Sequence, residues 1–437
     1  MKKPKINIPI DAWRPDRPVP ALETFCQRPA FSAEAEQVAR IVLDDIRRRG
    51  DDAVCEAVRK YEKRTLAPSA FRVTPDEIAA ARRAVDADFR KAARESDRRI
   101  ARFARAGLRR DWSIATPGGG RLGERFEPLA RVGAYIPGGE APLVSTALMT
   151  ITLARVAGVK EIVACSPGGR DRDIDPYILF ALDLAGATEI YRIGGIQAIG
   201  AMAIGTPTIP KVQKIVGPGG PYVTAAKRLV YGEVDLDLVA GPSEVAILAD
   251  ASADPRHLAA DLLSQLEHGT GHERALLVTT SKQVARRTAA ETVKQAATLS
   301  RAEFLLKVLP TNLRIAVVRN LEEGADLCNR FAAEHLELVC KQPRAVLKHI
   351  RGAGAVFLGS WTPECAGDFV AGPSHVLPTG GTAAVFSGLT VESFRRRASV
   401  LQFTRRDLRE TLPVIEAFGR VERLDGHSRS AAVRFES

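Results

Sequence analysis

The feature that most constrains the fold is an alternation of short apolar runs with longer helical segments, which occurs twice along the chain. In the first series, helical segments at 146–156, 176–185 and 222–231 separate strand-like runs that start at Val132 and continue at 161–166, 189–193 and 214–216. In the second series, helical segments at 255–268, 281–297, 321–333 and 343–350 separate strand-like runs at 275–279, 314–319, 336–340 and 355–358. Such alternation predicts right-handed βαβ units around mainly parallel sheets. The predicted fold class is therefore α/β, with two related Rossmann-like domains that have incomplete parallel sheets.

Charge and aromatic content limit the classes of function that the chain can have. The chain carries a net charge of +11, which raises nucleic-acid binding as a rival hypothesis. However, its arginines are interleaved with acids along helical segments, and aromatic residues make up only 6%, few for a base-stacking platform. A solvated basic face is the simpler interpretation.

The compartment is predicted from three further features of the sequence. Its six cysteines are scattered without a Cys-x-x-Cys pair, which is typical of reduced thiols. It has no apolar run of about 18 residues and no apolar core of a secretory signal near its first residues. We therefore expect a cytoplasmic protein that does not span a membrane.

Two pairs of residues combine groups suited to metal binding and to acid–base chemistry. Gln265 and His268 lie three residues apart in the helix expected over 255–268, so both would lie on one face. Their amide oxygen and imidazole nitrogen suit a mixed zinc site, although surface residues are the more common explanation of this spacing alone. Glu334 and His335 stand at a helix-to-strand junction, where a carboxylate beside an imidazole suits general-base work. An exposed charged pair is the alternative.

A long loop and three glycine turns complete the candidates. Residues 362–381 are crowded with glycine and proline yet carry Glu364, Asp368 and His375, and a loop of this length is usually functional or disordered. Asp368 would add a hard oxygen donor to a metal site. The turns at Gly138-Gly139, Gly194-Gly195 and 217–220 end strand-like runs, where doubly wound sheets bind ligands, although none has a standard dinucleotide or Walker A spacing.

Taken together, these stretches resemble the histidinol dehydrogenase family over almost the whole chain. The resemblance is carried by motifs in the family's order, at residues 132–139, 194–199, 240–245, 262–269, 334–337 and 367–379. It implies the oxidation of L-histidinol to L-histidine through an aldehyde, with NAD and one zinc ion per subunit. Glu334 and His335 would be the catalytic acid/base residues. Paralogues that oxidise other small polar alcohols, such as sulfonated propanediols, are the alternative within enzymes.

The same resemblance implies the ligand and substrate sets. Zinc would be bound by Gln265, His268 and Asp368 of one subunit and by His427 of its homodimer partner; the residues alone make His427 an ordinary tail residue. The substrate pocket would include these four ligands and His335, together with Ser243, Glu364, His375 and Glu422. The carboxylate of Glu422 would pair with the substrate's ammonium group, which favours histidinol over a sulfonate as substrate. Tyr135 and Gln197 would contact NAD, whereas Gly220 replaces an asparagine that is usual in the family and contacts the cofactor.

The resemblance also suggests how the chain is divided. Residues 1–25 would form an N-terminal arm, and residues 26–131 plus 244–389 a discontinuous catalytic α/β domain. Residues 132–243 would form a second α/β domain on the cofactor side, and residues 390–437 a helical C-terminal tail for dimerisation. The residues alone leave this insertion topology open. They do predict one long helix from the capping box at Thr74-Pro75-Asp76-Glu77 to about Gly107.

Overall fold

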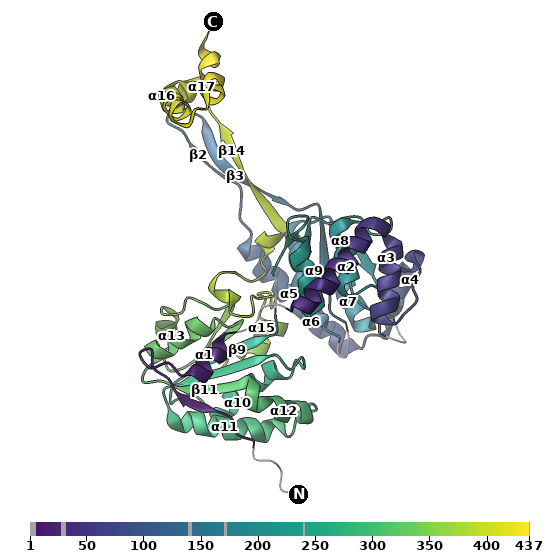
Figure 1. Cartoon of the computed structure of the whole chain (residues 1–437), viewed down its shortest axis with the longest axis vertical. Helices are drawn as coiled ribbons and strands as arrows, with labels where there is room; N and C mark the ends of the chain where they lie inside the picture. Colours follow the sequence, from purple (N-terminus) through teal and green to yellow (C-terminus); the bar gives the residue numbers. More distant parts are fainter. Residues whose placement is uncertain (1–5, 28–31, 139–141, 170–172, 239–240, 437) are drawn as a thin grey trace.

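The computed structural model describes residues 6–27, 32–138, 142–169, 173–238 and 241–436. Two predicted motif residues, Gly139 and Ala240, lie outside these ranges. The chain forms two α/β lobes and a narrow ribbon of strands that carries the C-terminal helices away from both (Figure 1). Among the helices of the described ranges, none combines the length and the hydropathy that crossing a bilayer requires.

The first lobe is built on a six-stranded parallel sheet in the order β1-β11-β10-β9-β12-β13. Its strands are β1 (Ile10–Ala12), β9 (Glu244–Ala249), β10 (Arg274–Thr279), β11 (Leu313–Val317), β12 (His335–Val339) and β13 (Ala355–Leu358). One face is covered by α10 (Pro255–Leu266), α11 (Lys282–Ala296) and α12 (Ala302–Asn312). The other is covered by α1 (Pro20–Cys26), α13 (Leu321–Phe331) and α14 (Pro343–Leu347). Because helices cover both faces, the central strands are apolar on both sides.

The second lobe is built on a five-stranded parallel sheet in the order β6-β5-β4-β7-β8. Its strands are β4 (Arg131–Tyr135), β5 (Glu161–Cys165), β6 (Glu189–Tyr191), β7 (Lys214–Val216) and β8 (Asp235–Leu236). Between them run α6 (Val144–Ala157), α7 (Pro176–Ala185), α8 (Gly195–Ile204) and α9 (Pro221–Val230). The strand order reverses between β4 and β7, which is where open α/β sheets bind ligands at their carboxyl ends. The two parallel sheets confirm the predicted fold class.

The N-terminal segments differ from the expected division of the chain. Residues 26–131 were assigned with 244–389, but their helices pack on the lobe of the five-stranded sheet, α2 against α8 and α9, α4 against α7, and α5 against α6. These helices are α2 (Ala33–Arg49), α3 (Asp51–Ala57), the π-helical turn η1 (Val58–Glu62), η2 (Pro68–Ala70), α4 (Pro75–Ala84) and α5 (Ala87–Gly107). The expected arm instead contributes β1 and α1 to the six-stranded lobe, where β1 pairs with β11. Apolar faces of amphipathic helices can cover either sheet, so sequence order did not decide the partner.

The predicted helix over 75–107 is interrupted. It divides at Val85, after which the Asp86 side chain accepts the N–H of Phe89 at 2.8 Å and begins α5. This cap makes Asp86 a helix start rather than an interior residue. Helices α8 and α12 are among those that the sequence did not predict.

The ribbon is a three-stranded antiparallel sheet that the sequence did not predict. It consists of β2 (Trp112–Ala115), β3 (Arg121–Pro128) and β14 (Arg395–Gln402), with β3 in the centre. Cross-strand ion pairs join Arg396 to Glu127 at 3.0 Å and Arg397 to Glu124 at 3.2 Å. Residues from 390 onward, expected to be helical, therefore include a strand that pairs with a segment about 270 positions earlier in the chain.

The C-terminal helices α16 (Arg405–Glu422) and α17 (Asp425–Ala432) pack on one another at the end of this ribbon (Figure 1). Beyond α17, the 3₁₀ turn η5 (Val433–Phe435) completes the tail. Asp407 joins α16 to the hairpin turn of the ribbon by accepting the N–H groups of Gly118 at 2.7 Å and Gly120 at 3.0 Å. Ribbon and tail are thus held together as one unit.

Candidate active site

The predicted catalytic pair lies at the amino end of β12 in the six-stranded sheet, beside the amino end of β9. His335 is the first residue of β12, Glu334 precedes it, and Ser243 precedes β9 beside them. Helix α10 and the short helix α15 (Glu364–Phe369) meet this edge of the sheet. The following loop reaches the other lobe, because Ser374 donates to the backbone oxygen of Met149 on α6 at 3.1 Å. The site therefore lies where the two lobes meet.

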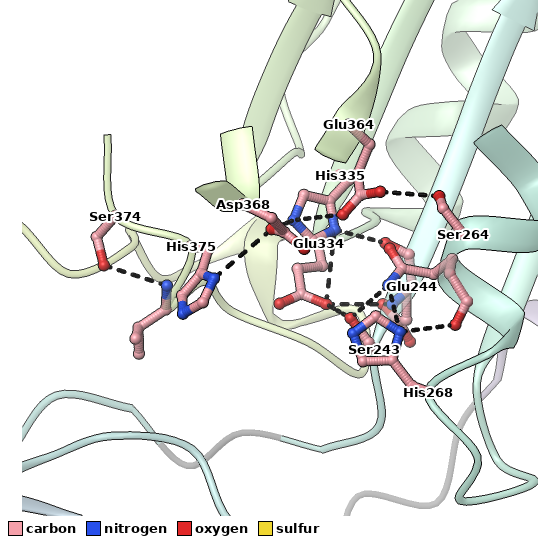
Figure 2. Close-up of polar contacts among 12 residues, drawn as sticks. Ser243, Glu244, Ser264, His268, Glu334, His335, Glu364, Asp368, Ser374 and His375 are labelled. Carbon is pink, nitrogen blue, oxygen red and sulfur yellow. Dashed lines mark hydrogen bonds and ion pairs between the residues drawn. The ribbon is translucent and has the colours of Figure 1, made fainter. Parts of the chain in front are cut away.

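Glu334 is a buried carboxylate with one occupied oxygen. Its Oε2 accepts hydrogen bonds from the Ser243 hydroxyl and from the backbone N–H of Glu244, the latter at 3.1 Å (Figure 2). Burial raises the pKa of Glu334 above its ordinary value. The alternative of an exposed charged pair is therefore excluded, since Glu334 is 6% exposed and His335 is 3% exposed.

The ring of His335 is oriented by the backbone. Its Nδ1 lies 3.2 Å from the carbonyl oxygen of Glu244, and because a carbonyl only accepts, Nδ1 must carry the proton. In the neutral ring this leaves Nε2 with a free lone pair. Burial alone would lower the pKa of His335, but the negative charges of Glu334, Glu364 and Asp368 outweigh it and raise that pKa to about 10.

Gln265 and His268 meet, although not on a helical face. Helix α10 ends at Leu266, so His268 lies in the turn beyond it and is exposed. Its Nδ1 is 3.0 Å from the backbone oxygen of Gln265 and 3.4 Å from the Gln265 side-chain nitrogen. That side-chain nitrogen also donates to the Ser243 hydroxyl at 2.8 Å, which links the pair to Glu334. The expected helix over 255–268 is corrected, since a turn brings the two side chains together.

Helix α15 presents Glu364 and Asp368 one turn apart on the same side. The Oδ1 atom of Asp368 lies 3.7 Å from both His335 Nε2 and His375 Nδ1 (Figure 2). Glu364 accepts a hydrogen bond from the Ser264 hydroxyl at 2.9 Å. Burial, followed by the charge of Asp368, raises the pKa of Glu364 to about 8. Burial also raises the pKa of Asp368, but the facing His335 and His375 hold it below its ordinary value.

The residues present fit a divalent cation. Within the described part of the chain, four buried atoms of this cluster lack a hydrogen-bond partner: Gln265 Oε1, His335 Nε2, Glu364 Oε1 and Asp368 Oδ1. Potential ligand atoms of the last three residues all lie within 4.8 Å of one another. Orphaned buried polar atoms need a partner, and a cation would satisfy the oxygens of Gln265 and Asp368 and offset the surplus of carboxylates around His335. Oxygen donors combined with imidazole nitrogen suit zinc.

Comparison with known proteins identifies the family. The histidinol dehydrogenase family model matches residues 27–435. The chain belongs to the histidinol dehydrogenase family. Among its relatives, the histidinol dehydrogenase of Heliobacterium mobile is 43% identical, over 92% of this chain and 93% of the relative. That of Symbiobacterium thermophilum is 42% identical, over 97% of this chain and 96% of the relative.

A solved structure agrees over nearly the whole chain. The crystal structure of histidinol dehydrogenase from Elizabethkingia anophelis matches with a TM-score of 0.92 and 35% identity, covering 98% of both chains. The roles of the individual site residues stay predictions.

Two predicted site residues lie far from this cluster. Glu422 ends α16, and His427 lies in α17; both are exposed. Figure 1 places these helices at the distal end of the ribbon, whereas α15 lies at the junction of the lobes. The chain therefore does not bring His427 to its own Gln265, His268 and Asp368. Its supply by a partner subunit stays a prediction.

The predicted cofactor residues lie at the carboxyl edge of the five-stranded sheet. Tyr135 ends β4, and its hydroxyl accepts the N–H of Gly195 at 3.2 Å. Gln197, in the first turn of α8, donates its side-chain nitrogen to Glu62 Oε1 at 2.7 Å, while its own Oε1 has no partner in the described residues. Burial raises the pKa of Tyr135 to about 12, so its hydroxyl keeps its proton.

Sequence reasoning missed residues on both sides of the site. Glu62 Oε1 also accepts the N–H of Gly194 at 2.9 Å, yet nothing in its local sequence indicated this. Glu337 had a detectable signal, since a strand places residues two apart on one face and Glu337 follows His335 at that spacing. Gly220, the departure from the family pattern, is the N-cap of α9, and a Cβ there would meet open space.

Proposed function

We propose that the chain oxidises L-histidinol to L-histidine through L-histidinal, with NAD as hydride acceptor and zinc as metal. The observation that carries this proposal is the buried Glu334–His335 pair, whose free oxygen and free ring nitrogen stand beside unpartnered metal donors. Family membership supplies the substrate class.

In the first oxidation, His335 is the base. A bound cation would offset the carboxylates that raise the pKa of His335 and so favour the neutral ring. In that ring Nε2 has a free lone pair, because Nδ1 donates to the carbonyl of Glu244. Nε2 takes the proton of the substrate alcohol while a hydride leaves its carbon for the nicotinamide, giving the aldehyde. The backbone contact fixes the ring plane, so the base needs no reorientation before it accepts the proton.

In the second oxidation, Glu334 is the base. It removes a proton from a water that attacks the aldehyde carbon, and the resulting hydrate delivers the second hydride. Ser243 and the N–H of Glu244 occupy one oxygen, which leaves Oε1 for the water.

Gln265, His268 and Asp368 of one subunit, with the partner subunit's His427, would hold the zinc ion. When bound, the ion would supply a Lewis acid and a template that orients the imidazole and amine of the substrate. His375 and Glu364 line the same cluster, and the partner subunit's Glu422 would face the substrate ammonium group.

A homodimer is proposed from the surface of the ribbon and tail. Apolar side chains are exposed there, with Leu401 at 70%, Phe418 at 63% and Val421 at 76%. Several large apolar side chains exposed on one small unit favour an interaction surface there, and a second copy of the chain would cover it. The same contact would carry His427 to the neighbouring cluster. The cytoplasmic location stays a prediction.

The test is the yield of NADH per alcohol consumed, with histidinol compared against 2,3-dihydroxypropane-1-sulfonate. We expect two NADH per histidinol, with the rate abolished by chelation and by His335→Asn, and no turnover of the sulfonate. Turnover of the sulfonate alone would favour the paralogous activity. Salt-dependent retention on DNA without NADH formation would favour the nucleic-acid-binding alternative.

A further inference from the structure

One buried side chain, that of Glu337, connects the three elements that carry the site, β12, α10 and α15. Glu337 lies on β12 two residues after His335 and is 2% exposed. Its Oε1 accepts the backbone N–H of Glu364, the first residue of α15, at 2.8 Å. Its carboxyl group also forms a hydrogen bond with the side chain of Asp261 on α10. Glu337 thus joins the strand of the catalytic pair to both helices that present metal donors.

Each contact of Glu337 involves a residue that is close in sequence to an expected metal ligand. Asp261 is one helical turn before Gln265 on α10, and Glu364 is one helical turn before Asp368 on α15. A shift at either contact would therefore carry over to the donor one turn away. Ser264 adds a second connection by donating to Glu364 at 2.9 Å. Hydrogen bonds thereby help to set the separation of α10 and α15.

We propose that Glu337 is a positioning residue that sets the spacing of α10 and α15, so that the free oxygens of Gln265 and Asp368 converge on one divalent cation. This rests on the proposed function in so far as that cation is the metal of the dehydrogenase.

Glu337 is itself neither a ligand nor a base in this arrangement. One oxygen is occupied by the N–H of Glu364 and the carboxyl is paired with Asp261, so it directs no free group into the cluster. Two buried carboxyl groups in contact are stable together only when they share one proton. A glutamine would therefore reproduce both contacts, with its oxygen accepting from Glu364 and its nitrogen donating to Asp261.

The test compares Glu337→Gln with Glu337→Leu in the full-length metal-free protein. Zinc affinity is measured by competition with a chromophoric chelator, and thermal unfolding of the metal-free protein reports the fold. We expect Glu337→Gln to bind zinc within about threefold of the unchanged protein, and Glu337→Leu to bind about 10- to 100-fold more weakly. Loss of affinity in Glu337→Gln as large as in Glu337→Leu would overturn the proposal, because the charge itself would then be needed.

A second pair of variants, at Asp261 on α10, tests the same proposal if Glu337→Leu on β12 fails to fold. Asp261→Asn keeps an acceptor for Glu337, whereas Asp261→Ala removes it and retains a good helix former. We expect Asp261→Asn to bind zinc like the unchanged protein and Asp261→Ala to bind it at least about tenfold more weakly, at a similar melting temperature. Unchanged affinity in Asp261→Ala would overturn the proposal. Zinc binding without oxidation of histidinol would instead contradict the proposed function alone.

Discussion

Replacing Glu334 by glutamine should separate the two oxidations. Both hydrogen bonds that Glu334 receives, from Ser243 and from the N–H of Glu244, reach the same oxygen, Oε2. The amide oxygen of a glutamine can take that position and keep both bonds. Its NH₂ group then occupies the position of the free Oε1. The change therefore removes the base and keeps the two hydrogen bonds that hold its side chain in place.

The size of the effect follows from what is lost. A positioned general base contributes about 10²- to 10⁴-fold, or about 3 to 5 kcal/mol at 1.36 kcal/mol per tenfold change in rate. His335 keeps its contact with the Glu244 carbonyl, so the alcohol step retains its own base. We expect the oxidation of histidinol to histidinal to slow by less than about tenfold and the oxidation of histidinal to slow by about 10²- to 10⁴-fold.

Single-turnover experiments measure both steps. Enzyme in excess is mixed with histidinol and NAD, quenched at intervals, and analysed for alcohol, aldehyde and acid, while a parallel experiment starts from histidinal. We expect Glu334→Gln to accumulate about one NADH and one aldehyde per site. As a control, His335→Asn should stop the reaction before aldehyde forms.

The reasoning would be refuted if Glu334→Gln oxidised histidinal at the unchanged rate. Equal slowing of both steps would also refute it, because Glu334 would then not act in the second step alone.

Three further predictions concern neighbouring residues. Ser243→Ala removes a donor that stabilises the Glu334 carboxylate; the pKa of Glu334, already raised by burial, should rise further, so the acid limb of the pH profile for histidinal oxidation should move to higher pH. Glu62→Ala leaves the Gln197 amide without its acceptor, so KM for NAD should rise about tenfold while KM for histidinol stays unchanged; equal changes in both would argue against a cofactor role. Gly220→Asn places a side chain in open space at an N-cap, so steady-state kinetics should show a lower KM for NAD, and calorimetry a melting temperature at least as high.

The two parallel sheets were predictable because their strands are buried on both faces. A strand such as β9, buried from Glu244 to Ala249, must be almost continuously apolar, and this pattern stands out from the helices around it. The ribbon gave no such signal. Strand β14 is largely exposed and rich in arginine, and it is paired with distant β3 through charged side chains.

The residues of the site were recognisable by type, but not their arrangement. Glu334 and His335 stand at a helix-to-strand junction and Asp368 in a long loop rich in glycine and proline, which made them candidates. Only the fold shows that β12 and α15 bring them together. Gln265 and His268 were paired for the wrong reason, since α10 ends before His268. Glu62 could not have been found, because its contact with Gln197 joins segments 135 positions apart. Contacts between distant segments depend on packing that no local pattern encodes.

The central claim, a site completed by a neighbouring tail, is tested most directly by mixing two inactive variants. The His335→Asn variant lacks the catalytic base but has an intact His427 in its tail. The His427→Ala variant lacks the tail imidazole but has an intact His335. In a mixed dimer with exchanged tails, one site combines an intact His335 with the partner subunit's His427. Co-expression should therefore restore about a quarter of the unchanged activity, as random pairing of two protomers gives. If the mixture stayed as inactive as either variant alone although mixed dimers were isolated, the shared site would be contradicted.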